Sequence, residues 1–171
     1  MMARDFPSVP CATVVTSITK ADRMENIFRT FLPEYVFHAA AYKHVPMMED
    51  NPCESIQNNV LGTKILADLS VKYGVLRFVM VSTDKAVNPT NVMGCSKRIC
   101  EVYVQSLNKA ERDGVVKGQT QFITTRFGNV LGSNGSVIPI FERQIKAGGP
   151  VTVTDPDIIR YFMLIPEACD S

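Results

Sequence analysis

The sequence lacks the features that mark several large classes of protein. It has no apolar run of about 18 residues, so we expect no membrane-spanning helix. Its basic and acidic residues nearly balance at a formal net charge of +1, so nothing favours a nucleic-acid-binding surface. The N-terminus has no basic region followed by an apolar core, so no signal peptide is expected. Internal repeats and low-complexity stretches are also missing.

Cysteine is present, but not in a pattern that builds a site. The five cysteines are scattered and odd in number, and no two form a C-x-x-C pair: Cys11, Cys53, Cys95, Cys100 and Cys169. This arrangement argues against a disulfide framework and against a zinc site. It suits free thiols in a reducing compartment, so we expect a cytoplasmic protein without a metal.

A third absence concerns phosphate binding. A dinucleotide-binding fold usually begins with a strand, a G-x-G-x-x-G turn and a helix whose N–H groups meet the pyrophosphate. The stretch Gly132-Ser133-Asn134-Gly135 comes too late in the chain and has the wrong spacing. The usual pyrophosphate anchor is therefore not in this sequence.

What is present is an alternation of strands and helices. Apolar, β-branched runs predict strands at 35–38, 77–81 and 121–125, with shorter candidates at 12–16 and 151–153. Helical spacing predicts helices at 21–31, 51–73, 93–113, 137–147 and 166–168. With 171 residues the chain is long enough for one domain with a sizeable core. The alternation predicts the α/β class, with a parallel sheet flanked by helices.

Polar side chains gather where three of these strands end. They lie at His38, from Ser82 to Lys85, and from Arg126 to Asn129. Because the carboxyl ends of parallel strands meet at one edge of the sheet, we expect these groups to lie at the same edge. Ligands bind at such edges in open α/β sheets.

The stretch from Ser82 to Lys97 is the centre of this arrangement. A hydroxyl pair, a carboxylate and an amine follow the strand, and the next helix carries Lys97 in its first turn. Met93 and Lys97 are four residues apart and share a helix face. A hydroxyl and a carboxylate facing a lysine form a layout for proton transfer. An ordinary solvated loop pair is the plainer interpretation of Asp84-Lys85 taken alone.

These residues and several others resemble the extended short-chain dehydrogenase/reductases. Within them the chain is similar to the CapD-like group of polysaccharide biosynthesis, which includes UDP-N-acetylglucosamine 4,6-dehydratases. The resemblance covers roughly residue 19 to the end. Its motifs are His38-Ala39-Ala40-Ala41-Tyr42-Lys43-His44-Val45-Pro46, Asn58-Asn59-Val60-Leu61-Gly62-Thr63, Thr83-Asp84-Lys85, Arg126-Phe127-Gly128-Asn129 and Arg160-Tyr161-Phe162. Met93 stands where most of these enzymes have tyrosine, as in one branch of the dehydratases.

The resemblance implies a partial Rossmann-like, doubly wound parallel sheet that lacks the first βαβ unit. Residues 1–18 would be a ragged N-terminal segment, and residues 19–130 a partial NAD(P)-binding domain. Residues 131–171 would begin an incomplete nucleotide-sugar-binding region. The chain would then be the middle of a longer enzyme, either a truncated gene product or a shortened piece, and inactive as it stands.

The implied reaction dehydrates a UDP-sugar by internal oxidation and reduction. NAD or NADP takes hydride from sugar carbon 4, a base removes the carbon 5 proton, an acid protonates the departing carbon 6 hydroxyl, and the hydride returns to carbon 6. By resemblance Asp84 would be the acid and Lys85 the base, which requires a raised pKa for Asp84 and a lowered one for Lys85. Thr83 would hold the 4-oxygen, and Lys97 the nicotinamide ribose. Met93 has no titratable proton and cannot be a base.

The resemblance also implies the remaining contacts. The catalytic residues would be Thr83, Asp84, Lys85 and Lys97. The cofactor-binding residues would be His38, Ala39, Ala40, Ala41, Asn59, Ser82 and Lys97. The substrate-binding residues would be Lys43, Arg126, Asn129, Ser136 and Arg160. We expect the full-length protein to be a homo-oligomer.

Two other functions stay open from the sequence. A UDP-sugar 4-epimerase shares the implied fold and cofactor, although epimerases of this superfamily generally keep the tyrosine. A non-catalytic remnant that serves at most as a binding or assembly module is the alternative of another class. The choice between NAD and NADP, and between retention and inversion at carbon 5, also stays open.

Overall fold

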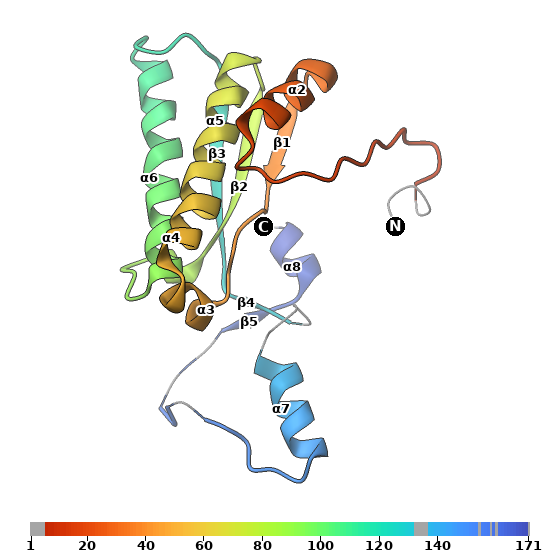
Figure 1. Ribbon diagram of the computed structural model, residues 1–171, viewed down its shortest axis with the longest axis vertical. Coiled ribbons are helices and arrows are strands. Elements are labelled where there is room, and N and C mark those ends of the chain that lie inside the picture. Colours follow the sequence, from red (N-terminus) through yellow and green to blue (C-terminus); the bar gives the residue numbers. More distant parts are fainter. Residues whose placement is uncertain (1–5, 132–136, 154, 158, 160, 171) are drawn as a thin grey trace.

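The computed structural model describes residues 6–131, 137–153, 155–157, 159 and 161–170 (Figure 1). No helix among these residues is long and apolar enough to cross a membrane.

A three-stranded parallel sheet forms the centre of the fold. Its strands are β1 (Tyr35–His38), β2 (Arg77–Thr83) and β3 (Gln121–Phe127), in the order β1-β2-β3. The register places Val36 beside Phe78, and Phe78 beside Phe122. All three carboxyl ends therefore lie at one edge, which confirms the predicted α/β fold with a partial Rossmann-like parallel sheet.

Three helices cover one face of this sheet. They are α2 (Ala21–Phe31), α5 (Gly62–Lys72) and α6 (Val92–Arg112). Figure 1 shows α5 and α6 running alongside the strands, with α2 near β1. One apolar cluster joins them to the strands: Met24, Phe28, Leu66, Ala67, Leu69, Val75, Phe78, Met80, Cys100, Val104 and Phe122. Burying these side chains is the main source of stability for this half of the chain.

Side chains on the two faces of the sheet differ strongly in burial. Phe78 and Met80 on β2 are fully buried under the helices, while Val79 between them is half-buried. On β1 the neighbour of Val79 is Phe37, whose side chain is 76% exposed. Successive side chains of a strand point to opposite faces, so the described helices leave the Phe37 face largely open.

The connection from β1 to β2 is less regular than the sequence predicts. One helix was expected over residues 51–73, but the structure has α4 (Pro52–Ser55), a π-helical segment η1 (Ile56–Leu61) and then α5. A short helix α3 (Val45–Asp50), which the sequence did not predict, precedes them. The expected end is confirmed, because Gly74 has φ +70°, a conformation that glycine adopts without strain.

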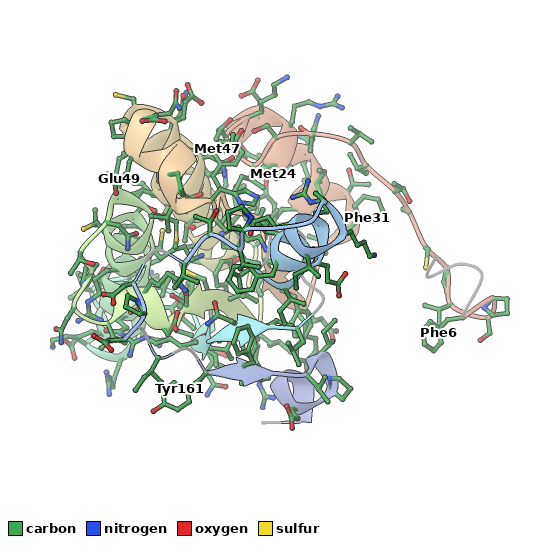
Figure 2. The ribbon with its side chains drawn as sticks, turned by 90° about the horizontal axis from the view of Figure 1, so that it is seen from below. Phe6, Met24, Phe31, Met47, Glu49 and Tyr161 are labelled. Carbon is green, nitrogen blue, oxygen red and sulfur yellow. The ribbon has the colours of Figure 1, made fainter. Side chains whose placement is uncertain are left out.

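The C-terminal part lies below the sheet in Figure 1. It contains α7 (Val137–Lys146), α8 (Ile165–Asp170) and a small parallel pair, β4 (Asn129–Val130) with β5 (Phe162–Met163). Neither short strand predicted at 12–16 and 151–153 forms. A strand needs a neighbour for its N–H and C=O groups, and the described residues provide none to these segments. Figure 2 shows Phe6 far from the body, and Tyr161 pointing outward from it.

Candidate functional site

The end of β2 and the start of α6 meet through a tight turn. A single 3₁₀ turn, η2 (Asp84–Ala86), follows the strand directly, and Ala86 is fully buried. The side chain of Asn91 caps α6 by accepting a hydrogen bond from the Gly94 N–H at 2.8 Å. The Glu49 carboxylate accepts another from the Val92 N–H at 2.6 Å. These two caps fix the start of α6, whose first two turns carry Met93 and Lys97.

Thr83, Asp84 and Lys85 form a local hydrogen-bonded group. The Thr83 hydroxyl donates to Asp84 Oδ1 at 2.9 Å and accepts from the Lys85 N–H at 3.3 Å. Lys85 Nζ donates to the same Asp84 oxygen at 3.1 Å. The carboxyl end of β2 therefore presents a hydroxyl, a carboxylate and an amine within one turn of chain.

The protonation expected for Asp84 is not the one that this geometry favours. Partial burial would raise the pKa of the Asp84 carboxyl, but the hydrogen bonds from Lys85 and Thr83 outweigh it and hold the pKa below the ordinary value. The expected rise in this pKa is wrong for the ligand-free chain. Asp84 is a carboxylate here because two donors converge on one of its oxygens.

Gly94 lets this turn pack closely against α6. A Cβ at Gly94 would lie 2.3 Å from the Lys85 carbonyl oxygen and 3.2 Å from the Lys85 carbonyl carbon. Both are backbone atoms, which cannot move aside as a flexible side chain can. The missing side chain therefore sets how closely the Asp84–Ala86 turn approaches the helix.

We expect Gly94→Ala to destabilise the chain by about 1–3 kcal/mol, the usual cost of forcing an extra group into a packed site. Alanine favours a helix over glycine by about 1 kcal/mol, so a net loss would come from the Lys85 contact. The matched control is Gly62→Ala, where the atoms nearest the new Cβ belong to the side chain of Ile18 and not to backbone. Urea unfolding measures both variants, and equal effects would contradict the packing argument.

A pocket of about 160 Å³ opens beside this turn. It is lined by Ala39, Ala41, Tyr42, Lys43, Val81, Ser82, Thr83, Met93 and Lys97. Lys97 is only 5% exposed, and within the described part of the chain its ammonium has no hydrogen-bond partner. Burial lowers the pKa of Lys97. The pocket therefore holds a buried cationic group next to small, apolar walls.

Asn59 joins the pocket wall to α6. Its side chain accepts from the Tyr42 N–H at 2.7 Å and donates to the Tyr42 carbonyl at 3.0 Å, and it also donates to the Ser96 hydroxyl at 3.0 Å. Asn59 is 1% exposed. The sequence predicted that a buried amide here needs partners, and the structure provides them from the protein. Its amide groups are thus occupied in holding the loop before α3.

His38, at the end of β1, does not line the pocket. It is 2% exposed, and its Nε2 lies 2.8 Å from the Thr63 hydroxyl. Burial, assisted by the charge of Lys97, lowers the pKa of His38 from 6.5 to about 4. The imidazole is therefore neutral in the folded chain at pH 7.

This buried imidazole predicts a pH-dependent stability. Because its folded pKa lies below its unfolded pKa, the stabilisation is complete above about pH 6.5 and is lost as the pH falls towards about 4. The shift corresponds to about 3 kcal/mol. Urea unfolding at pH 7, 5.5 and 4 measures how much the free energy of unfolding falls. In His38→Gln most of this pH dependence should disappear. A His38→Gln variant with the same pH dependence as the parent would show that another group titrates.

A buried carboxylate that the sequence did not single out connects α6 with two strand ends. Glu101 is fully buried, and it accepts from the Ser82 hydroxyl at 2.7 Å. Arg126 at the end of β3 holds it with two hydrogen bonds of 2.9 and 2.6 Å, and Arg98 adds one of 3.0 Å. Burial would raise the pKa of Glu101, but these donors lower it to about 2.

Only some of the other residues predicted to bind cofactor or substrate lie at the pocket. Arg126 faces Glu101, and Asn129 donates to the Tyr161 carbonyl at 3.1 Å. Ala40 is exposed and does not line the pocket, whereas Lys43 does. Ser136 and Arg160 lie outside the described residues. The pocket thus gathers Thr83, Ser82, Lys97, Ala39, Ala41 and Lys43 from the predicted set.

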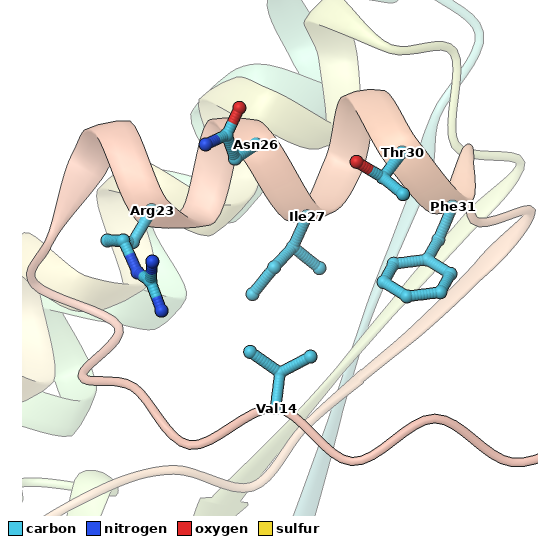
Figure 3. A pocket seen from close by; sticks show the side chains of 6 residues that line it. All are labelled: Val14, Arg23, Asn26, Ile27, Thr30 and Phe31. Carbon is cyan, nitrogen blue, oxygen red and sulfur yellow. The ribbon is translucent and has the colours of Figure 1, made fainter.

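A second, more open cavity of about 250 Å³ lies between α2 and the N-terminal segment. Figure 3 shows Val14 facing Ile27 across it, with Arg23, Asn26, Thr30 and Phe31 around the rim. None of the residues predicted for catalysis or binding lines it. It forms beside the segment where the predicted strand at 12–16 is missing.

Comparison with known proteins identifies the family. Residues 4–171 match the family described as polysaccharide biosynthesis protein. The chain is 54% identical over 155 residues to the capsular polysaccharide biosynthesis protein CapD of Staphylococcus aureus, covering 91% of this chain and 25% of the relative. It is 42% identical over 137 residues to a UDP-glucose 4-epimerase of Rickettsia akari, covering 80% and 39%. The chain thus spans about a quarter to two fifths of these relatives.

Solved structures agree with the sequence comparison. Pen from Bacillus thuringiensis is 34% identical with a TM-score of 0.85, over 98% of this chain and 50% of that one. WbmG of Bordetella bronchiseptica, solved in complex with NAD, is 26% identical with a TM-score of 0.72, over 93% and 52%. The similarity of fold covers nearly the whole of this chain. The chain belongs to the polysaccharide biosynthesis protein family, within the extended short-chain dehydrogenase/reductases that its motifs resemble.

Proposed function

We propose that this chain forms the catalytic centre of a UDP-N-acetylglucosamine 4,6-dehydratase in polysaccharide biosynthesis. The observation that carries the proposal is the group Thr83, Asp84 and Lys85 at the rim of a pocket lined by Met93 and Lys97. The reaction needs an acid and a base at one edge of a sugar, and this turn presents both within hydrogen-bond reach of each other. The family supports polysaccharide biosynthesis as the setting.

The pocket suits the nicotinamide end of NAD or NADP. Lys97 offers a buried ammonium for ribose hydroxyls, and Ala39 and Ala41 offer small walls for a flat ring. WbmG, with the same fold, was solved with NAD. When bound, the cofactor supplies the site that accepts and returns hydride. Ser82 is held by Glu101, and its place in the wall is thereby fixed.

The roles of the chain's own residues follow from their positions. Thr83 lines the pocket and can hold the 4-oxygen of the sugar, while Asp84 and Lys85 follow it on the same turn, outside the lining of the pocket. Asp84 protonates the departing hydroxyl of carbon 6, and Lys85 removes the proton of carbon 5. Met93 is 4% exposed and offers only an apolar contact. Lys43, which lines the pocket, offers a cation for a phosphate of the substrate.

A UDP-sugar 4-epimerase is the second candidate. It is favoured by the similarity to the Rickettsia akari enzyme. An epimerase needs no acid and base for carbons 5 and 6, so the Asp84–Lys85 pair would have no task in it. A non-catalytic binding or assembly module is the third, and it predicts cofactor or sugar binding without turnover. A cytoplasmic, homo-oligomeric enzyme completes the proposal.

The test uses a hybrid enzyme, in which this chain replaces its matched segment in Staphylococcus aureus CapD. It is incubated with UDP-N-acetylglucosamine and NAD or NADP, and the products are separated by capillary electrophoresis. We expect a 4-keto-6-deoxy UDP-sugar. A 4-epimer would support the second candidate, and an unchanged substrate would refute both enzymatic proposals. The chain alone should show no turnover, because it carries no G-x-G-x-x-G anchor.

A further inference from the structure

The Ser82 hydroxyl, in a residue that lines the pocket, has its one hydrogen already in use. Ser82 is 5% exposed, and its Oγ lies 2.7 Å from Glu101 Oε1. An ionised carboxylate has no hydrogen to give, so the serine is the donor in this contact. A hydroxyl has one hydrogen and two lone pairs. What Ser82 can still offer to a ligand is therefore a hydrogen-bond acceptor.

The Glu101 carboxylate is held ionised and in one orientation. Its Oε1 accepts from Ser82 and from Arg126 Nε at 2.9 Å, and its Oε2 accepts from Arg126 Nη2 at 2.6 Å and Arg98 Nη1 at 3.0 Å. The two contacts with one planar guanidinium fix the plane of the carboxylate. Glu101 is fully buried, so these donors are its partners in place of water. The direction of the Ser82 hydrogen is thereby set by Glu101.

Lys97 has the opposite hydrogen-bonding character in the same pocket. It lies one helical turn before Glu101 on α6, it is 5% exposed, and its ammonium can only donate. The pocket of about 160 Å³ thus contains a residue that only donates and a hydroxyl that can only accept. Two neighbouring hydroxyls on a sugar ring match this pair, because one can accept from Lys97 while the other donates to Ser82.

We propose that Glu101 is a positioning residue that makes Ser82 a fixed acceptor, and that the pocket thereby selects a vicinal diol. The inference rests on the cofactor-binding part of the proposed function, in which the nicotinamide ribose enters this pocket. The ribose of the cofactor and the hexose of the substrate both carry such a diol. The ribose is the expected source, and binding of the two ligands is measured separately.

Glu101→Gln tests the direction of the Ser82 hydrogen without changing the size of the side chain. The amide has one oxygen and one NH₂ group. At the place of Oε2 the NH₂ group would meet donors of two cationic side chains, Arg126 and Arg98. At the place of Oε1 it meets one guanidinium N–H and the Ser82 hydroxyl, which can turn to accept. The amide nitrogen should therefore face Ser82 and release the hydroxyl hydrogen.

The experiment uses the hybrid enzyme and two NAD analogues, in which fluorine replaces the 2′- or the 3′-hydroxyl of the nicotinamide ribose. Fluorine is small and has no hydrogen to donate. Calorimetric titration gives the ratio of the dissociation constants of analogue and NAD. In the parent this ratio should be about tenfold for one analogue, since a buried acceptor loses its donor. In Ser82→Ala and Glu101→Gln it should fall to about threefold or less, because the acceptor is absent or reversed.

Two further measurements complete the design. Arg98→Ala is the matched control, because it removes a partner of Glu101 Oε2 and leaves the Ser82 contact in place. Its ratio should equal that of the parent. The second measurement repeats the titrations with UDP-N-acetylglucosamine and its 4-fluoro analogue. A ratio that depends on Ser82 only in this series would support the diol and assign it to the substrate sugar.

A purely structural role for Glu101 would weaken NAD and its analogues together and leave their ratio unchanged. Ratios that stay the same in Ser82→Ala for both ligands would overturn the proposed acceptor. A ratio lost in Ser82→Ala but kept in Glu101→Gln would overturn the role of Glu101. A parent hybrid that binds NAD but forms no 4-keto-6-deoxy product refutes the dehydratase proposal, while the ratios still decide this one. If it binds neither ligand, both proposals fail. Circular dichroism checks that each variant is folded.

Discussion

Lys85→Ala in the hybrid enzyme is expected to lower kcat for dehydration by about 10²–10⁴-fold, the usual contribution of a positioned base. Alanine cannot accept the carbon 5 proton, and no other amine shares the Asp84 turn. Asp84→Asn should lower kcat by a similar factor, because the amide cannot protonate the leaving hydroxyl. Capillary electrophoresis of the 4-keto-6-deoxy product gives the rate, and fluorescence titration gives the NAD affinity.

The split between rate and affinity is the informative result. Neither side chain lines the pocket proposed for the nicotinamide, so NAD affinity should change by no more than about twofold. The matched control is Lys109→Ala, which breaks the exposed Lys109–Asp113 pair at the far end of α6. Full activity in Lys85→Ala would remove the proposed base.

Glu101→Leu is expected to destabilise the 171-residue chain by about 3–5 kcal/mol, the range for breaking a buried ion pair. The carboxylate is fully buried, and its loss leaves the Ser82 hydroxyl and the Arg126 guanidinium without their acceptor. The lower end of the range is expected, because Arg126 is 39% exposed and can regain water. Urea unfolding at pH 7 followed by circular dichroism gives the free energy.

Two comparisons test the cause of this effect. Arg98→Ala removes the partner that is 45% exposed and should cost only about 0–1 kcal/mol. In the parent, stabilisation by Glu101 is complete above about pH 4.5 and is lost as the pH falls towards about 2, because its folded pKa is depressed. The Glu101→Gln variant should not show this fall in the free energy of unfolding at low pH. If the free energy of unfolding of Glu101→Gln falls as much as that of the parent between pH 4.5 and 2, the fall is caused by other carboxyl groups.

The sheet was predictable because its signals are local. β-branched and aromatic residues are frequent in the segments that become β1, β2 and β3, and polar groups follow each of them. Helix α2 has the bounds that its spacing predicts, and Asn59 has the buried partners that its place on an apolar helix demands. The gathering of Thr83 and Ser82 with Lys97 at one pocket follows from these elements.

Other features depend on contacts between distant segments, which no local pattern records. Nothing in the sequence near Glu101 shows that Arg126 will reach it across 25 positions. The pKa direction of Asp84 depends on two donors meeting one oxygen, and this requires the geometry of the 3₁₀ turn. The role of Gly94 depends on the backbone of a different element, the Lys85 carbonyl. From the preferences of residues within helices alone, alanine would be expected at position 94.

The parallel register of the sheet has a consequence for how the chain folds. Tyr35 pairs with Arg77, and Arg77 pairs with Gln121, so each strand pairing closes a loop of more than forty residues. The entropy of closing such loops is lost before the strand contacts compensate for it, and chains dominated by distant contacts fold slowly. Helices α5 and α6 lie within these two loops and can form early, since their hydrogen bonds are local. The speed at which the Thr83–Lys85 turn is assembled is therefore governed by the search for strand partners on either side of β2, and not by the turn itself.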